Sequence, residues 1–322
     1  MKSSLSWRPA TAADIPALVQ LANTANRIDD PARVVVADDI IKASRTPNPE
    51  KNTLLGVDAA DGIVAYASVL EPADGPLAVT VEAVGVVHPK YRAAGLGTKL
   101  IKWQETRARE MFAGRGAARP NWLETAAAGT AHSARKLLTD HGFVEKRCWL
   151  EMARELSDPI PAVKLPEGVR ITTPHDFSEA TRLAYNDAFQ DHWGSRPDSR
   201  ADWEAREARA DYRPDLSFIA VAEDSQGTPE VTGLVTTQVS EEQFEARGGP
   251  FAYIHLLGVR RAWRGKGIAS ALLNHSMRVF KDAGFERAEL NVDSSSLTGA
   301  VGVYENLGFR EAHRHSTFIK EL

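Results

Sequence analysis

Two glycine-containing segments carry the residue types of an anion-binding turn. They are Arg92-x-x-Gly95-x-Gly97 and Arg264-Gly265-Lys266-Gly267-Ile268-Ala269. Each follows an apolar run typical of a strand and precedes apolar residues at helical spacing. The first amides of a helix lack intrahelical partners and glycine permits close approach, so a phosphate can bind there. One such segment alone is equally compatible with a tight connection and an exposed arginine. Two copies favour phosphate binding, above all at residues 264–269.

The spacing of these segments belongs to a longer repeat. Arg92 and Arg264, Gly95 and Gly267, and Gly97 and Ala269 are each 172 residues apart. Each half then closes on a Gly-Phe pair, at residues 142–143 and 308–309. This period is too long for a solenoid unit and indicates a duplicated domain. Residues 157–166 are rich in proline, so we expect a linker there between a domain at 1–156 and a second at 167–322.

The elements that must position these turns can be predicted in both halves. Apolar runs at 79–87, 252–259 and 288–292 read as strands, and helical spacing follows each glycine turn. A short helix is expected through Tyr304. Thr11 with Asp14 and Thr173 with Asp176 have the spacing of helix N-caps, with Pro174 expected at the first helical position. The predicted fold class is α/β (mixed α+β), with a mixed central sheet flanked by helices in each half.

Composition narrows the function classes. The chain has 322 residues, 43% hydrophobic and 25% charged, with a net charge of −4, which argues against nucleic-acid and membrane-surface binding. Cys148 is the one cysteine, and His313 and His315 have no ligand partners at suitable spacing, so no metal site is expected. No signal peptide or apolar span is evident, and we expect a cytoplasmic protein. The sequence leaves the oligomeric state open.

Two motifs in the second half resemble those of the GNAT superfamily of acyl-CoA-dependent N-acetyltransferases. Residues 264–269 after Leu-Leu-Gly-Val resemble the family's pyrophosphate-binding segment. Ala300-x-x-x-Tyr304-x-x-x-Gly308-Phe309 resembles its last helix, which lies beside the thiol end of coenzyme A. The landmarks cover most of both halves. The chain therefore resembles a tandem two-domain type, similar in layout to the mycothiol synthases.

The resemblance implies acetyl-CoA as cosubstrate and assigns residues to it. In the second half these are Leu257, Val259, Arg264, Gly265, Lys266, Gly267, Ile268 and Ala269. The main chain at 257–259 would polarise the thioester carbonyl. In the first half the corresponding residues are Val87, Arg92, Gly95 and Gly97.

Tyr304 matches the family's general acid. A phenol can protonate a leaving thiolate because its pKa exceeds that of the thiol. The alternative is an aromatic residue that only packs in the core. Leu138 stands at the matching position of the first half and has no proton to donate. We therefore expect the catalyst in the second domain, while the first domain could still hold CoA without chemistry.

The general base is less clearly marked. Many family members carry a glutamate eleven residues before the arginine of the turn, where this chain has Tyr253. His255 lies two residues on, at the same face of the strand. Arylalkylamine acetyltransferases resemble this arrangement, so His255 is the candidate base. The alternative is a hydrogen-bonded structural histidine.

The acceptor pocket in this family is lined by the segment after the first helix. Here that segment offers Asp191, His192 and Trp193 as a cation partner, a titrating group and a stacking surface, with Tyr253 on the neighbouring strand. The alternative for the three is a helix cap and a core aromatic residue. The predicted function is acetyl-CoA-dependent transfer of an acetyl group to a primary amine of a small molecule, by direct attack in the C-terminal domain. The competing class is a non-catalytic acyl-CoA-binding or structural protein.

Overall fold

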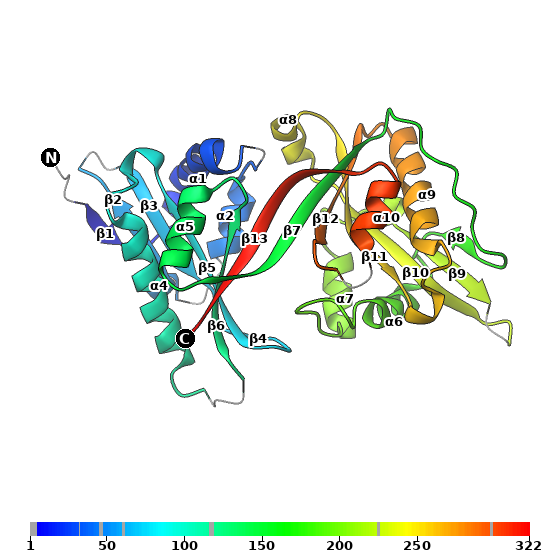
Figure 1. Ribbon diagram of the computed structural model, residues 1–322, viewed down its shortest axis with the longest axis horizontal. Helices are drawn as coiled ribbons and strands as arrows, with labels where there is room; N and C mark the ends of the chain where they lie inside the picture. The colour runs from blue at the N-terminus through cyan, green and yellow to red at the C-terminus, as the bar shows by residue number, and fades with distance from the viewer. Residues whose placement is uncertain are drawn as a thin grey trace. The chain divides into compact units, whose positions relative to one another are not determined.

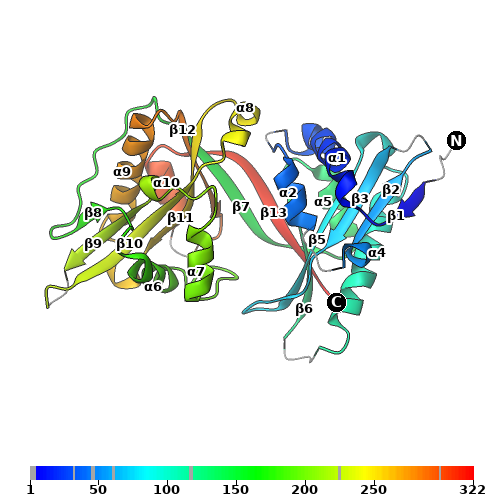
Figure 2. The same ribbon diagram turned by 180° about the vertical axis from the view of Figure 1, so that it is seen from behind.

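The computed structural model describes residues 5–31, 33–44, 48–59, 62–115, 119–223, 226–296 and 299–322. Two compact units divide the chain. Unit 1 comprises Met1–Cys148 and Arg314–Leu322, and unit 2 comprises Trp149–His313. Each is a mixed sheet with helices on both faces (Figures 1 and 2), which confirms the predicted fold class.

Unit 1 is built around the first glycine turn. Its strands occur in the order β1-β2-β3-β5-β6, with the end of β13 beyond β6, and only β5 and β6 run parallel to each other among these pairs. The elements are β1 (Ser6–Arg8), α1 (Ile15–Asp29), α2 (Ala37–Ser44), α3 (Pro49–Asn52), β2 (Thr53–Val57), β3 (Ile63–Val69), β4 (Ala73–Asp74), β5 (Val79–Val87), α4 (Leu96–Phe112), β6 (Asn121–Ala128), α5 (His132–Asp140) and β7 (Val144–Glu155).

Alternation along the strands gives unit 1 two apolar layers. Val81 and Ala83 of β5 pack with Ile101 of α4 on one face. Tyr66 of β3 packs with Leu18 of α1 on the opposite face. Since successive side chains of a strand point to opposite faces, α1 and α4 cover the two sides of one sheet.

Unit 2 repeats this plan around the second glycine turn. Its sheet has the order β7-β12-β11-β10-β9-β8, to which β7 contributes its second part, and β11 and β12 are parallel. The elements are β8 (Arg170–Thr172), α6 (Ser178–Ala188), α7 (Arg200–Glu207), β9 (Phe218–Glu223), β10 (Pro229–Gln238), α8 (Phe244–Arg247), β11 (Phe251–Val259), α9 (Ile268–Asp282), β12 (Arg287–Asp293), α10 (Ala300–Asn306) and β13 (Arg310–Glu321).

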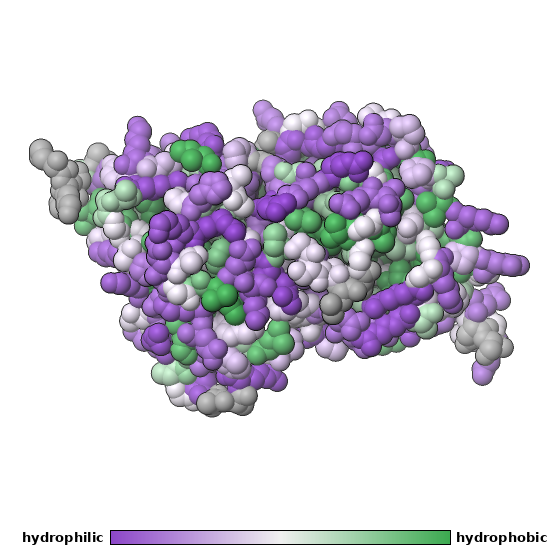
Figure 3. All heavy atoms as spheres, in the orientation of Figure 1, coloured by the Kyte–Doolittle hydropathy of each residue, from purple (hydrophilic) through white to green (hydrophobic). Residues whose placement is uncertain are grey.

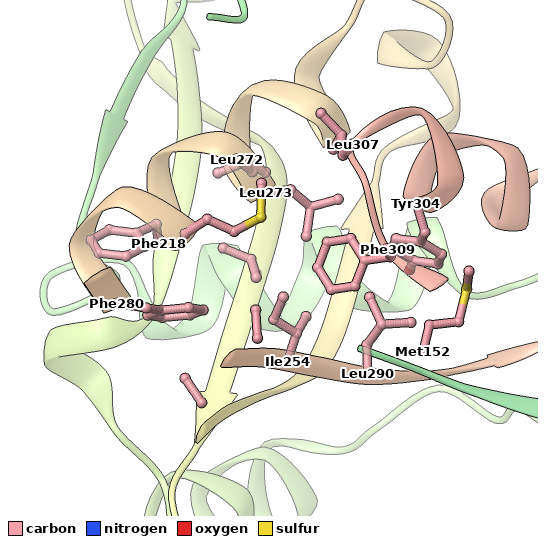
Figure 4. Packing of buried hydrophobic residues seen from close by; sticks show 14 of the residues in the cluster. Met152, Phe218, Ile254, Leu272, Leu273, Phe280, Leu290, Tyr304, Leu307 and Phe309 are labelled. Carbon is pink, nitrogen blue, oxygen red and sulfur yellow. The ribbon is translucent and has the colours of Figure 1, made fainter. Parts of the chain in front are cut away.

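The larger core of unit 2 lies between the sheet and helices α9 and α10. Leu272 and Phe280 of α9 pack there with Leu290 of β12 and Phe309 (Figure 4). Burying side chains of this size stabilises a unit by roughly 1.5–3 kcal/mol each before entropy is counted. The opposite face packs Trp203 of α7 against β9 and β10. The helix that follows the second glycine turn and the helix of Tyr304 therefore rest on a filled core.

The division between the units falls at residues 148 and 149, ahead of the predicted linker. Trp149–Glu155 of β7 pair with β12 of unit 2, whereas His315–Glu321 of β13 pair with β6 of unit 1. Each half of the chain thus ends in a strand whose second part joins the sheet of the other half. Apolar alternation predicts a strand but does not indicate its pairing partner. The predicted domains 1–156 and 167–322 therefore each kept their own last strand.

The local predictions held except at one helix start. The strand at 79–87 is confirmed, the strands at 252–259 and 288–292 are slightly longer, and Thr11 with Asp14 forms the predicted capping box. The prediction of an N-cap at Thr173 is wrong, because α6 begins at Ser178 with Phe177 as its N-cap.

The face seen in Figure 3 is mostly hydrophilic, with apolar residues scattered among the polar ones. Within the described residues, no helix is long and apolar enough to cross a bilayer.

Candidate active site

The glycine turn of unit 2 joins the end of β11 to the start of α9. Gly265 and Gly267 have φ angles of +74° and +82°, which favour glycine. A Cβ at either position would find no heavy atom within 4 Å. The backbone of the turn is therefore uncovered at both glycines, as the close approach of a phosphate to a helix start requires.

Arg264 anchors this turn to its neighbours. Its Nε donates to the carbonyl of Val259 at 3.3 Å, and a terminal nitrogen donates to the carbonyl of Ala188 at 2.7 Å. Asp191 lies in the same network, at 2.5 Å from Arg261 and 3.2 Å from Arg264. Asp191, predicted to lie in the acceptor pocket, thus forms ion pairs with Arg261 and Arg264 beside the glycine turn.

Strands β11 and β12 separate beside the turn. They pair from Phe251 with Arg287 to Ile254 with Leu290, and no further pair between them occurs in the described residues. The rest of β11 pairs with β10 alone. The edge of β11 at Leu257 and Val259 is therefore available to main-chain hydrogen bonds from a ligand lying between the two strands.

A bulge places His255 in β11. Thr236 of β10 pairs with Leu256 and Thr237 pairs with Ile254, so His255 is one extra residue. Ile254 and Leu257 can both contribute to the core under α9 because of this insertion. A pocket on the other face is lined by Trp203, Arg206, Glu207, Tyr212, Thr236, Gln238, His255 and Leu256. The bulge thus directs the candidate base away from the core and into this pocket.

Burial and a contact with Arg206 together keep His255 neutral. A terminal nitrogen of Arg206 lies 3.3 Å from Nε2 of His255, and Nε of Arg206 donates to Asp198 at 2.6 Å. Because arginine only donates, Nε2 accepts and Nδ1 carries the ring proton. Burial, and then the charge of Arg206, lower the pKa of His255 to about 4. His255 is therefore neutral near pH 7.

Charged residues that the sequence did not single out surround Tyr253. Tyr253 pairs with Glu289 of β12, and Arg247 lies 2.9 Å from Glu289 and 3.4 Å from Glu151. Burial, and then the charge of Glu151, raise the pKa of Tyr253 to about 12. Glu151, Arg247 and Glu289 come from three elements distant in sequence. No local spacing could have grouped them.

Tyr304 projects from α10 and is 6% exposed. Its ring lies 5.9 Å from that of Phe309 in an edge-on contact. Figure 4 shows the two beside the strands that carry Leu290 and Met152. Burial raises the pKa of the Tyr304 hydroxyl, and nearby Tyr253 adds to the shift. The phenol is therefore protonated at neutral pH, as a general acid must be.

His192 and Trp193 lie just beyond α6 in an aromatic cluster. Trp149 of β7 is 5.9 Å from His192 and 6.4 Å from Trp193, measured between ring centroids. Phe189 adds a further ring 5.6 Å from His192. The structure thus brings two of the three predicted acceptor residues to one place. It adds Trp149 of β7, a residue that the sequence analysis did not single out.

Comparison with known proteins decides the family. The profile described as "Acetyltransferase (GNAT) family" matches residues 179–309. A mycothiol acetyltransferase from Thermobispora bispora is 30% identical over 301 residues, covering 93% of each chain. The chain belongs to the GNAT family of acetyltransferases. A mycothiol acetyltransferase from Salinispora arenicola is 32% identical over 82% of this chain and 80% of its own. The crystal structure of a GCN5-related N-acetyltransferase from Sphaerobacter thermophilus superposes with a TM-score of 0.80 at 28% identity, over 98% of this chain and 95% of the other.

The GNAT turn of unit 1 is similar in backbone and different in its surroundings. Gly95 has a φ of +82° and open space at its Cβ position. Arg92 donates to the carbonyl of Val87 at 3.3 Å and pairs with Asp29 at 2.5 Å. A Cβ on Gly97 would lie 2.5 Å from a methyl of Leu137, so this glycine serves helix packing.

In unit 1, β5 and β6 correspond to β11 and β12, and α5 corresponds to the helix of Tyr304. Strands β5 and β6 pair from Val79 with Asn121 to Glu82 with Glu124 and then separate, as β11 and β12 do. Leu138 of α5 is buried in the apolar core.

Among the described residues, no group of three or more His, Cys, Asp or Glu side chains is arranged to hold a metal ion.

Proposed function

We propose that unit 2 of this GNAT enzyme acetylates the primary amine of a small molecule related to mycothiol. The observation that carries the proposal is the open glycine turn at Gly265 and Gly267 beside two separating strands and a buried, protonated Tyr304. Full-length similarity to proteins named mycothiol acetyltransferase supports this acceptor class. Acetyl-CoA is the acyl donor of the family.

In this proposal the glycine turn and the strand opening hold acetyl-CoA. Amides of residues 264–269 receive the pyrophosphate, and the pantetheine lies between β11 and β12. A main-chain amide near Leu257 stabilises the oxyanion as the amine nitrogen attacks the thioester carbon. The carbon–sulfur bond then breaks, and the thiolate takes the proton of the Tyr304 hydroxyl.

His255 is proposed to receive the acceptor's proton. With a pKa near 4 it is too weak a base to deprotonate a free ammonium group. The amine therefore reacts from its neutral fraction, and His255 accepts the proton as the nitrogen becomes acidic during attack. Arg206 occupies Nε2 and Nδ1 is already protonated, so this transfer needs Arg206 to turn aside and free the Nε2 lone pair.

The acceptor is proposed to lie across the face that carries His255, Tyr253 and the aromatic cluster of Trp149, His192 and Trp193. The rings offer stacking surface, and Glu151 offers a partly exposed carboxylate for a cation.

Unit 1 is proposed to bind CoA without turnover. Gly95 keeps the open turn and β5 and β6 keep their separation, whereas Leu138 has no proton to give. The cytoplasmic location expected from the sequence remains a prediction.

The proposal is tested by offering the full chain a panel of amines with acetyl-CoA and measuring acetylated products by mass spectrometry. The panel contains the amine that yields mycothiol on acetylation, an arylalkylamine, a polyamine and a lysine-rich peptide. We expect the highest kcat/KM for the first. Binding of acetyl-CoA without product from any amine would instead support the non-catalytic alternative.

A further inference from the structure

Arg154 of β7 is a cation in the core of unit 2. It is 4% exposed and packs on the face that also carries Met152 and α10. Its guanidinium donates to three main-chain carbonyls, those of Leu307 at 2.6 Å, Glu155 at 3.0 Å and Pro159 at 2.8 Å. Burial lowers the pKa of Arg154, and the charge of Asp158 offsets this less strongly. Burying a charge costs free energy unless its N–H donors are satisfied. The three carbonyls therefore fix the position of the guanidinium.

The carbonyl of Leu307 is the end of the helix that carries Tyr304. Leu307 and Phe309 both donate their amides to the carbonyl of Tyr304, at 3.0 Å each, and so close the helix around that residue. Gly308 between them has a φ of +91°, and a Cβ there would lie 3.0 Å from Nε of Arg154. The glycine of the Gly-Phe pair thus lets the turn approach the guanidinium. Figure 4 shows Tyr304 and Phe309 side by side, with Leu307 farther from both.

We infer that Arg154 is a positioning residue for Tyr304. By holding the carbonyl at the C-terminal end of α10, it fixes where the phenol meets the sulfur of the thioester. The inference rests on the proposed role of Tyr304 as general acid. It also means that the active site of unit 2 needs a side chain from the strand that precedes the linker, outside the predicted C-terminal domain.

Unit 1 contains the same clamp without a reactive group. Lys320 of β13 donates to the carbonyl of His141 at 2.7 Å, directly before Gly142. Lys320 pairs with Leu123 of β6, much as Arg154 pairs with Ala288 of β12. Here Glu105 provides a carboxylate partner at 2.7 Å. The helix that is held carries Leu138, so Lys320 is a matched control.

The test compares Arg154→Met, Arg154→Lys, Lys320→Met and Tyr304→Phe in the full chain, with Arg154→Met and Tyr304→Phe also combined. A small displacement of a catalytic group can cost about a hundredfold in rate, so we expect Arg154→Met to lower kcat by about that factor. The KM for acetyl-CoA should change less than threefold. Arg154→Lys should recover part of the loss, and Lys320→Met should leave kcat unchanged. In the Tyr304→Phe background, Arg154→Met should lower kcat no further than about twofold, because the proton it positions is gone.

Three results would overturn the inference. These are wild-type kcat in a folded Arg154 variant, an equal loss with and without the Tyr304 hydroxyl, and a parallel rise in the KM for acetyl-CoA. Should Arg154→Met fail to fold by circular dichroism, Arg154→Lys carries the same cycle. Full activity of Tyr304→Phe would instead remove the proposed acid itself. Loss in Tyr304→Phe with none in the Arg154 variants would remove only the positioning role.

Discussion

The two glycine turns share a backbone and differ in what surrounds them. Arg92 and Arg264 each donate Nε to the last residue of the preceding strand at 3.3 Å, and Gly95 and Gly267 share a φ of +82°. Unit 1, however, places Ala93 at a φ of +59° where unit 2 has Gly265. The anion-binding turn is a backbone feature, so it can persist while reactive side chains around it are lost.

The strands before the two turns differ as well. β5 pairs with β3 in unbroken register, whereas β11 carries the extra residue His255. Because of the bulge, the 172-residue offset that relates the two turns does not hold for the strand residues before His255. In the sheets, Glu82 pairs with Glu124 as Tyr253 pairs with Glu289. The one residue inserted in β11 is thus the candidate base His255, and β5 has no counterpart to it.

The largest expected contrast lies between Tyr304 and Leu138. Tyr304→Phe removes only the hydroxyl, and a general acid contributes roughly a hundred- to ten-thousand-fold, so kcat should fall within that range, by about 3 to 5 kcal/mol of barrier. The KM for acetyl-CoA should barely change. Leu138→Ala should cost unit 1 about 2–5 kcal/mol of stability and leave kcat per folded molecule intact. Near-full kcat of Tyr304→Phe with the true acceptor would show that unit 2 has no acid at this position.

A second contrast concerns the two turns as CoA sites. Gly267→Glu introduces a side chain and a negative charge where the pyrophosphate is proposed to bind, and should weaken that site by about a hundredfold or more. Calorimetry on the full chain should show two sites falling to one, with activity lost. Gly95→Glu should also remove one site and preserve activity. Wild-type saturation at one CoA would leave unit 1 as scaffold only.

A third contrast is in pH dependence, because only β11 inserts a histidine. The pKa of His255 is lowered from 6.5 to about 4 on folding, so the unfolded state binds the extra proton between these values. Stability of unit 2 should therefore be lost as the pH falls from 6.5 to 4, by up to about 3 kcal/mol. Urea unfolding of His255→Gln should lack this component. Parallel losses in wild type and variant would assign the effect to other groups, among them His275, whose pKa is also lowered by burial.

The smallest contrast lies within the turns. Alanine at positive φ costs about 1–2 kcal/mol, part of which the greater freedom of unfolded glycine offsets. Ala93→Gly should therefore stabilise unit 1 by about 0.5–1 kcal/mol, and Gly265→Ala should destabilise unit 2 by a similar amount. Thermal unfolding of the two variants measures this. Changes of the opposite sign would mean that the two residues are not in corresponding backbone conformations.

Local pattern alone determined the duplication, the two turns and the elements beside them. The strand at 79–87, the helices after Gly95 and Gly267 and the short helix of Tyr304 depend on spacing within a dozen residues, which periodicity reports directly. The family motifs lie in this same local category, which is why the acetyltransferase class could be predicted.

Only the tertiary structure decided which strands pair and which charges meet. Residues 149–155 join β12 and residues 315–321 join β6, so Arg154 and Lys320 each hold a helix that the sequence had assigned to the other domain. The bulge at His255 and its contact with Arg206 also arise from pairing between distant segments. Strand pairing depends on complementarity between whole surfaces, and no local spacing of residues encodes it.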